Sequence, residues 1–308
     1  MSDSRIETFL TPRDWFRHAV GRFNHAGLAL GHGATNAVDE AAFLILEALH
    51  LPIDSFDPFA DGRLLVEERQ RLAELIDARV EQRKPLAYLL NRTYIQGVPF
   101  YVDERVIVPR SFIGELLFTD LIGENGPVDT PEDVESVLDL CTGGGSLAIL
   151  AAGAFPIAKV DAVDLSRDAL AVARKNVEMH KLGDRIELFE GDLFKPLGDR
   201  TYDVILTNPP YVDAEALAAF PPEFAAEPRI AHAGGKDGLD FVRKIIAEAR
   251  GHLNAGGALV CEVGQGRGAL EEEYPDLAWI WLDTRESEGE VFFIRAEDLP
   301  AVKKRGRG

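Results

Sequence analysis

Residues 137–146 read Val-Leu-Asp-Leu-Cys-Thr-Gly-Gly-Gly-Ser, a short apolar run followed by a glycine-rich turn. Glycine tolerates positive φ and lets a ligand approach the backbone closely, as in the turns that bind dinucleotides. The stretch therefore predicts a buried strand, a turn suited to a ligand and a helix near 146–153. A glycine-rich turn on its own is equally compatible with a purely structural role, so the rest of the chain has to be considered.

Further apolar runs alternate with helical stretches from about residue 110 to the end of the chain. This alternation is typical of an α/β domain with a largely parallel sheet. We expect further helices near 167–180 and 238–253. The predicted strands are seven: 136–140, 159–165, 185–189, 202–207, 258–263, 279–282 and 291–294.

The first part of the chain has a different pattern. Residues 1–90 carry apolar side chains at helical spacing and predict a small helical domain that packs against the rest. Residues 91–109 are expected to form a linking β-hairpin, with strands within 93–108. The α/β domain then covers 110–308.

Composition and charge restrict the possible partners. The chain has 308 residues and a formal net charge of −19. An acidic surface repels phosphate backbones and attracts basic proteins, so we expect a cationic protein partner and no direct nucleic-acid binding. The beginning of the chain lacks a signal-peptide core, and no apolar run is long enough for a membrane span, which predicts a cytoplasmic protein. Cys141 and Cys261 are expected to be small buried hydrophobes rather than a disulfide or zinc ligands.

Three further predicted strands end in polar residues. Asp164 ends the second, where an acid can bind a ribose diol or, equally, cap the next helix. Asp192 and Leu193 follow the third and could flank an adenine. The fourth ends in Asn208-Pro-Pro-Tyr211. The carboxyl ends of parallel strands meet at one edge of a sheet, which predicts a single ligand site there.

The Asn208-Pro-Pro-Tyr211 element predicts methyl transfer to a planar nitrogen. A nitrogen conjugated to a carbonyl or an aromatic ring is a poor nucleophile, so a site that uses it must hold its NH2 group and direct its lone pair. The Asn208 side-chain oxygen and the Pro209 carbonyl can accept the two N–H bonds, because Pro209 and Pro210 form a stiff turn. Tyr211 offers a flat face for a planar group.

Other chemistries lack their motifs. No glycine-rich turn ends in the Gly-Lys-Ser/Thr of a phosphate-binding loop, and no Gly-x-Ser-x-Gly elbow points to a hydrolase. The seven histidines show no paired spacing of metal ligands, so no metal is expected.

Together these motifs resemble the class I S-adenosylmethionine methyltransferases that modify glutamine side chains at N5. The resemblance covers 110–296 and implies a seven-stranded, Rossmann-like sheet with S-adenosyl-L-methionine as the cofactor. By position, Asp139 and the turn Cys141-Thr142-Gly143-Gly144-Gly145 would hold the methionine part, with Cys141 in place of the usual first glycine. Asp164 would bind the ribose beside Leu165, and Asp192 and Leu193 would lie near the adenine. Asn208, Pro209, Pro210 and Tyr211 would hold the glutamine amide, with Asn208 also near the cofactor.

Within that family the chain resembles the branch that methylates large-subunit ribosomal protein three, a basic protein. The stretches that carry this resemblance are 13–17, 29–33, 101–111, 227–231 and 238–240. It implies that the helical domain recognises the substrate. The alternatives are the peptide-chain release-factor branch, an adenine-N6 methyltransferase acting on nucleic acid, and a non-catalytic scaffold. The segment 212–236 is expected to be a loop over the site, and the basic tail 303–308 a solvated end.

Overall fold

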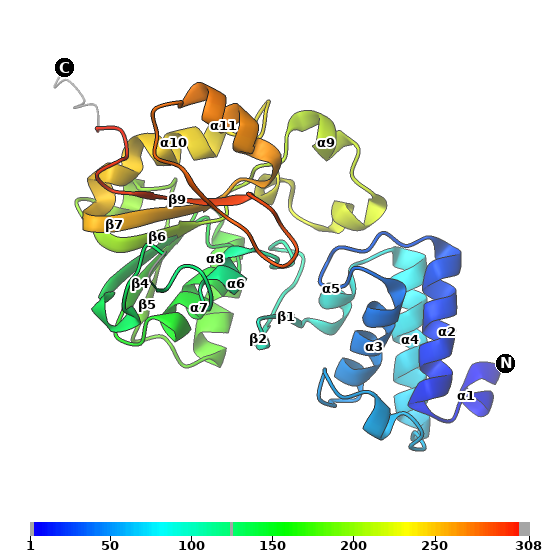
Figure 1. The fold of residues 1–308 in the computed structure, drawn as a ribbon. Helices are drawn as coiled ribbons and strands as arrows, with labels where there is room; N and C mark the ends of the chain where they lie inside the picture. Colours follow the sequence, from blue (N-terminus) through cyan, green and yellow to red (C-terminus); the bar gives the residue numbers. More distant parts are fainter. Residues whose placement is uncertain (1–2, 124–125, 302–308) are drawn as a thin grey trace.

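The computed structural model describes residues 3–123 and 126–301. Seven strands form one sheet in the order β5-β4-β3-β6-β7-β9-β8, which confirms the predicted α/β fold and the number of strands in its sheet (Figure 1). The neighbouring strands β5, β4, β3, β6 and β7 are parallel to one another. Strand β9 is antiparallel to both β7 and β8. The strands are β3 (Ser136–Leu140), β4 (Lys159–Asp164), β5 (Ile186–Glu190), β6 (Tyr202–Thr207), β7 (Leu253–Glu262), β8 (Ile280–Leu282) and β9 (Val291–Arg295).

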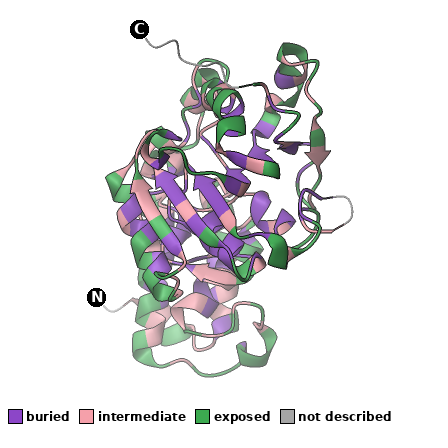
Figure 2. Ribbon diagram, turned by 90° about the vertical axis from the view of Figure 1, so that its left-hand side faces the viewer, coloured by how far each residue is buried: buried purple, intermediate pink, exposed green. Residues whose placement is uncertain are grey.

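Helices cover both faces of the sheet. One face packs against α6 (Ile113–Leu116), α7 (Ser146–Ala154) and α8 (Arg167–Met179), and the other against α10 (Asp240–Ala249) and α11 (Arg267–Glu273). Side chains of a strand alternate between faces, so Val137 lies in one core and Leu138 in the other. Figure 2 shows that much of the central sheet is buried, with intermediate and exposed residues at intervals along the strands.

The first 90 residues contain only helices among their described regular elements. These are α1 (Ser4–Thr8), α2 (Pro12–Ala26), α3 (Ala37–Ala48), a short 3-10 turn η1 (Asp57–Phe59), α4 (Val66–Gln82) and α5 (Leu86–Leu90). They enclose their own core around Trp15, Phe23, Leu44 and Ile76. The sequence fits its helices locally: Thr11 and Asp14 form a capping box before α2, with Pro12 in its first turn.

The linking hairpin is shorter than predicted. Strands β1 (Thr93–Ile95) and β2 (Val98–Phe100) pair antiparallel, and residues 101–112 continue without a strand. The physical reason is a competing partner: the Tyr101 backbone N–H donates to Asn176 Oδ1 at 2.7 Å, and Asn176 Nδ2 donates back to the Tyr101 carbonyl at 3.0 Å. Helix α8 therefore binds the backbone that a longer hairpin would have used, and the linker continues along the α/β domain.

The segment after β6 is partly helical. Residues 212–236 contain α9 (Ala214–Ala218) and the 3-10 turns η4 (Pro222–Ala226) and η5 (Arg229–Ala231). Across the described ranges 3–123 and 126–301, no helix has both the length and the apolar character needed to cross a bilayer. The basic tail Lys303–Gly308, predicted to be a solvated end, lies outside the described residues.

Candidate active site

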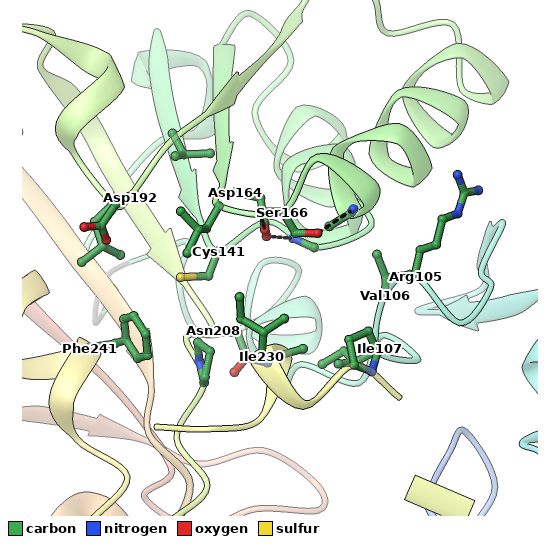
Figure 3. A pocket seen from close by; sticks show the side chains of 18 of the residues that line it. Arg105, Val106, Ile107, Cys141, Asp164, Ser166, Asp192, Asn208, Ile230 and Phe241 are labelled. Atoms are coloured by element: carbon green, nitrogen blue, oxygen red, sulfur yellow. Dashed lines mark hydrogen bonds between the residues drawn. The ribbon is translucent and has the colours of Figure 1, made fainter. Parts of the chain in front are cut away.

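A cavity lies where β3, β4, β5 and β6 end (Figure 3). It holds roughly 770 Å³ of empty space, part of it open to solvent. The four strand ends that the sequence singled out do converge. The predicted site residues that line the cavity are Cys141, Gly143, Asp164, Leu165, Asp192, Leu193, Asn208 and Pro210.

The remaining predicted residues are not among those that line the cavity. Asp139 and Thr142 are buried and hydrogen-bonded to each other, and Gly145 caps the start of α7. Gly144 packs against Val172 and Asn176 of α8. Pro209 is buried, and Tyr211 points its hydroxyl group toward Glu262, so both support the cavity from behind Asn208 and Pro210.

The glycine-rich turn needs left-handed backbone at two positions that face the cavity. Gly143 has φ +55°, and Cys141, at the usual glycine position, has φ +59°. An L-residue other than glycine pays roughly 1–2 kcal/mol for this conformation. Cys141 lines the cavity and is only half-buried, so the prediction of a small buried hydrophobe is right for Cys261 but wrong for Cys141.

We expect Cys141→Val to unfold about 1–2 kcal/mol more easily than Cys141→Gly, because a β-branched side chain fits left-handed backbone poorly. The valine variant should also bind the cofactor more weakly, since the turn would have to shift. Urea unfolding and calorimetric titration of both variants test this expectation. Equal stability and affinity would mean that the backbone of the turn adapts freely.

Asp139 ties the turn to α7. Its side chain is fully buried, and Oδ2 accepts hydrogen bonds from Thr142 Oγ1 at 2.6 Å and from the Ala148 N–H at 3.0 Å. The other oxygen, Oδ1, is buried without a hydrogen-bond partner among the described residues. Burial raises the pKa of Asp139 to about 7. The glycine-rich turn is therefore backed by a buried carboxyl group with one unpaired oxygen.

Asp164 faces the cavity at the end of β4. One carboxylate oxygen accepts from the Gly143 N–H and the other from the Ser166 N–H, both at 2.8 Å. The cap of α8 is Ser166, whose side chain accepts from the Ala169 N–H. Helix capping, which the sequence left open for Asp164, is therefore carried out by Ser166. Each Asp164 oxygen keeps a lone pair for a ligand hydroxyl.

The end of β5 contributes Asp192 and Leu193. Leu193 has φ +49° and is mostly buried, and Asp192 Oδ2 pairs with Lys195 Nζ at 2.5 Å. In Figure 3 Asp192 lies on the same side of the cavity as Phe241, and Arg105 and Ile107 form the opposite side. An apolar residue and a carboxylate thus border one end of the cavity.

Asn208 has the open hydrogen-bonding capacity that an amide-binding site requires. Its side chain lines the cavity, and no group in residues 3–123 or 126–301 forms a hydrogen bond with it. The Pro209 carbonyl likewise accepts no hydrogen bond within that described part of the chain. Two acceptors on consecutive residues therefore lack an intramolecular partner, and of these two residues only Asn208 lines the cavity.

Glu262 holds Tyr211 in place. It ends β7, is fully buried, and its Oε1 accepts from the Tyr211 hydroxyl group at 3.0 Å. Its Oε2 accepts from Ser111 Oγ at 2.7 Å and from the Phe112 N–H at 2.9 Å. Gly264 lies so close that an added Cβ would come within 2.8 Å of the Tyr211 ring. Burial raises the pKa of Tyr211, so its hydroxyl stays protonated and donates.

The pH dependence of stability should report on Glu262. Burial raises the pKa of its carboxyl group to about 7. The stability that this group contributes to the fold is therefore fully present below its pKa in the unfolded chain, near 4.5, and is lost as the pH rises through about 7. We expect Glu262→Gln to flatten the slope of the unfolding free energy by about 1 kcal/mol per pH unit between pH 5 and 7. Urea unfolding across pH 5–8 measures it, with the exposed Glu272→Gln as control. An unchanged slope would contradict the raised pKa.

Two irregular segments complete the wall of the cavity, and the sequence had assigned only the second of them to the site. The linker contributes Arg105, Val106 and Ile107, and the segment 212–236 contributes Pro228, Ile230 and Ala231. The expectation that 212–236 lies over the site is met by these contacts. Phe241, from the start of α10, is a further lining residue that was missed. Apolar residues in irregular segments carry no local signal in the sequence. Glu262 was also missed, although an acid at the end of a strand such as β7 is a recognisable signal.

The segment 212–236 is fastened by two buried glutamates. Glu227 accepts from Arg110 Nη1 at 2.9 Å and Nη2 at 2.8 Å, and from the Val108 N–H at 2.9 Å. Glu223, with no exposed surface, lies 2.6 Å from Arg83 Nη2 and accepts from the Ala29 N–H at 3.0 Å. The wall of the cavity is thereby anchored to both the linker and the helical domain.

Comparison with known proteins places the chain among methyltransferases. Residues 126–221 match the family model "Methyltransferase small domain". Proteins named "Ribosomal protein uL3 glutamine methyltransferase" are similar over nearly their whole length. The Bradyrhizobium diazoefficiens protein is 57% identical over 93% of this chain and 91% of its own. The Burkholderia pseudomallei protein is 52% identical over 96% of this chain and 97% of its own. The Bordetella pertussis protein is 50% identical over 97% of this chain and 99% of its own.

Proposed function

Because the chain belongs to the family of ribosomal protein uL3 glutamine methyltransferases, we propose that it methylates the side-chain amide nitrogen, N5, of a glutamine in uL3 in the cytoplasm. This membership confirms the family resemblance inferred from the sequence. The observation that carries the proposal is the meeting of Asp164 and Asn208 in one cavity, with the Asn208 side chain free to bind an amide.

The residues present fit S-adenosyl-L-methionine, which supplies a methyl group activated by a sulfonium centre. Asp164 offers two carboxylate oxygens to a ribose diol. Asp192 and Leu193 border the place expected for the adenine. At the glycine-rich turn, a Cβ added to Gly143 would meet no atom within 4 Å, and Asp139 Oδ1 lacks a donor.

The protein's own task is to position the glutamine amide. Asn208 Oδ1 and the Pro209 carbonyl would accept hydrogen bonds from its two N–H groups. These two bonds would fix the plane of the amide and direct the nitrogen lone pair into the cavity. Tyr211, held by Glu262, keeps the proline turn in this position. The new nitrogen–carbon bond would form as the bond between the methyl carbon and the sulfonium sulfur breaks, and the amide nitrogen would then release its proton to solvent. No residue needs to form a covalent intermediate.

The experiment is incubation of the protein with tritiated S-adenosyl-L-methionine and, side by side, isolated uL3 and a peptide-chain release factor, followed by mass spectrometry. Label on a glutamine of uL3 alone supports the proposal. Label on the release factor alone would replace the substrate but keep the chemistry. Label on neither would contradict the proposed function, and adenine-N6 transfer would then be tested with DNA and RNA, although the acidic charge of −19 disfavours it.

A further inference from the structure

A second cavity lies within the helical domain, next to β1 of the hairpin. We call it the helical-domain pocket and define it by Leu30, His32, Asp39, Glu40, Phe43 and Leu86. It holds roughly 680 Å³ of empty space, part of it open to solvent. None of its residues belongs to the cavity described above, so its shape and chemistry need their own explanation.

One part of this pocket is apolar. Leu30, Phe43 and Leu86 come from three different segments of the helical domain and present hydrocarbon surface to it. Phe43 also packs edge-on against Tyr94 of β1, with ring centroids 6.0 Å apart. An occupant with an aliphatic stem would bury that stem here.

The polar part of the pocket has an excess of negative charge. Arg79 is almost fully buried, and its charge is already balanced by Glu40, 2.5 Å from Nε, and by Glu223, 3.9 Å from Nη1. Asp39 is different. It is exposed, accepts from the Asn36 side-chain amide at 2.7 Å, and has no cation within ion-pair distance in the described part of the chain. The pocket therefore offers one unbalanced carboxylate.

His32 provides an independent sign of a missing partner. Its side chain is only 5% exposed, and neither ring nitrogen has a hydrogen-bond partner among residues 3–123 and 126–301. Its Nε2 is 3.5 Å from Glu227 Oε2, and its ring packs against Phe224 with centroids 4.3 Å apart. A buried polar group without a partner is costly, so its presence in the lining points to a ligand that supplies one.

The helical-domain pocket is also close to the active site. Pro228 lines the active-site cavity described above. The preceding residue, Glu227, lies beside His32 of the helical-domain pocket. The segment Glu227-Pro228 therefore contacts the lining of both cavities.

We propose that the helical-domain pocket binds a lysine or arginine side chain of the protein substrate. The inference rests on the proposed function, which makes the substrate a basic ribosomal protein. The aliphatic stem lies against Leu30, Phe43 and Leu86, and the cationic head pairs with Asp39 beside His32. The helical domain thus contributes to substrate choice through a defined subsite.

The test compares Asp39→Asn, which removes only the charge, and Asp39→Lys with the wild type. We expect Asp39→Lys to weaken binding of isolated uL3 to the cofactor-free protein at least tenfold and to raise KM similarly. Asp39→Asn should show a smaller loss in the same direction, with kcat and the Kd for S-adenosyl-L-methionine unchanged in both. The matched control is Glu74→Lys, which makes the same charge change at an exposed position of α4 outside the pocket. Thermal unfolding checks that every variant is folded.

The outcomes separate this inference from the proposed function. If the wild type neither binds nor methylates uL3, the proposed function fails. If the wild type does both and the Asp39 variants match it, or if Glu74→Lys loses as much binding, only the pocket assignment is overturned. As a direct probe, Nα-acetyl-lysine amide should shift NMR amide resonances of residues 30–40, and Nα-acetyl-norleucine amide, which lacks the ammonium group, should shift them less. Equal shifts from both compounds would argue against recognition of the charge.

Discussion

Replacing Asn208 with alanine is expected to lower kcat about 10²- to 10³-fold, which corresponds to about 3–4 kcal/mol of barrier. The side chain lines the cavity and has no partner in the described part of the protein, so a bound amide would be its main hydrogen-bond partner. Its removal leaves one N–H of the glutamine amide without an acceptor and the nitrogen poorly aimed. Single-turnover methyl transfer to uL3, followed with tritiated cofactor, measures the effect.

The control for this loss is Asn24→Ala, an exposed asparagine in α2 far from the cavity along the chain. Calorimetric titration should find that Asn208→Ala still binds the cofactor, with a Kd raised less than kcat falls, because Asp164 and the glycine-rich turn are intact. Near-normal turnover in Asn208→Ala would overturn the assignment of Asn208 as a catalytic residue.

The parts of the site that follow from the parallel sheet could be predicted from the sequence. Asp164, Asp192 and Asn208 each stand where a predicted strand ends, and parallel strands bring such ends together whatever the loops do. The number of strands in the main sheet could also be predicted, as could the helices α7 and α8 that follow β3 and β4. Both follow from local patterns of apolar residues. The start of β7 was missed, because Asn254-Ala-Gly-Gly257 is typical of a turn, yet Leu253 pairs with Tyr202 across a register shift.

Features that depend on contacts distant in sequence could not be predicted. The hairpin ends early because Asn176 binds the backbone of Tyr101. The cavity wall includes both Ile107 of the linker and Ile230 of the segment 212–236, and these two segments are joined through Glu227. A glutamate before a proline carries no sign in the sequence that it will be buried with an arginine, so the anchoring of the wall appears only in the structure.

Replacing Glu227 with glutamine is expected to lower the free energy of unfolding by about 3 kcal/mol. Breaking a buried ion pair typically costs about 3–5 kcal/mol, and the lower value is appropriate because 28% of the Arg110 side chain remains exposed. The glutamine NH2 group would also face donors, either Arg110 Nη2 or both Arg110 Nη1 and the Val108 N–H, so at least one hydrogen bond would be lost. Because Pro228 and Ile230 follow in the chain, the cavity wall should loosen and the Kd for the cofactor should rise.

Urea unfolding and calorimetric titration test both effects of the Glu227 change, with Glu215→Gln as control because Glu215 is exposed in the same segment. The pH dependence gives a further check. Burial alone would raise the pKa of Glu227, but contacts with His232, His32 and Arg110 hold this pKa well below its ordinary value. The charge of Glu227 therefore stabilises the fold above the unfolded pKa near 4.5, and this stabilisation is lost as the pH falls below it. The stability difference between wild type and Glu227→Gln should accordingly shrink in acid. A difference that is independent of pH would show that the charge of Glu227 is not what anchors the wall, and that its shape alone suffices.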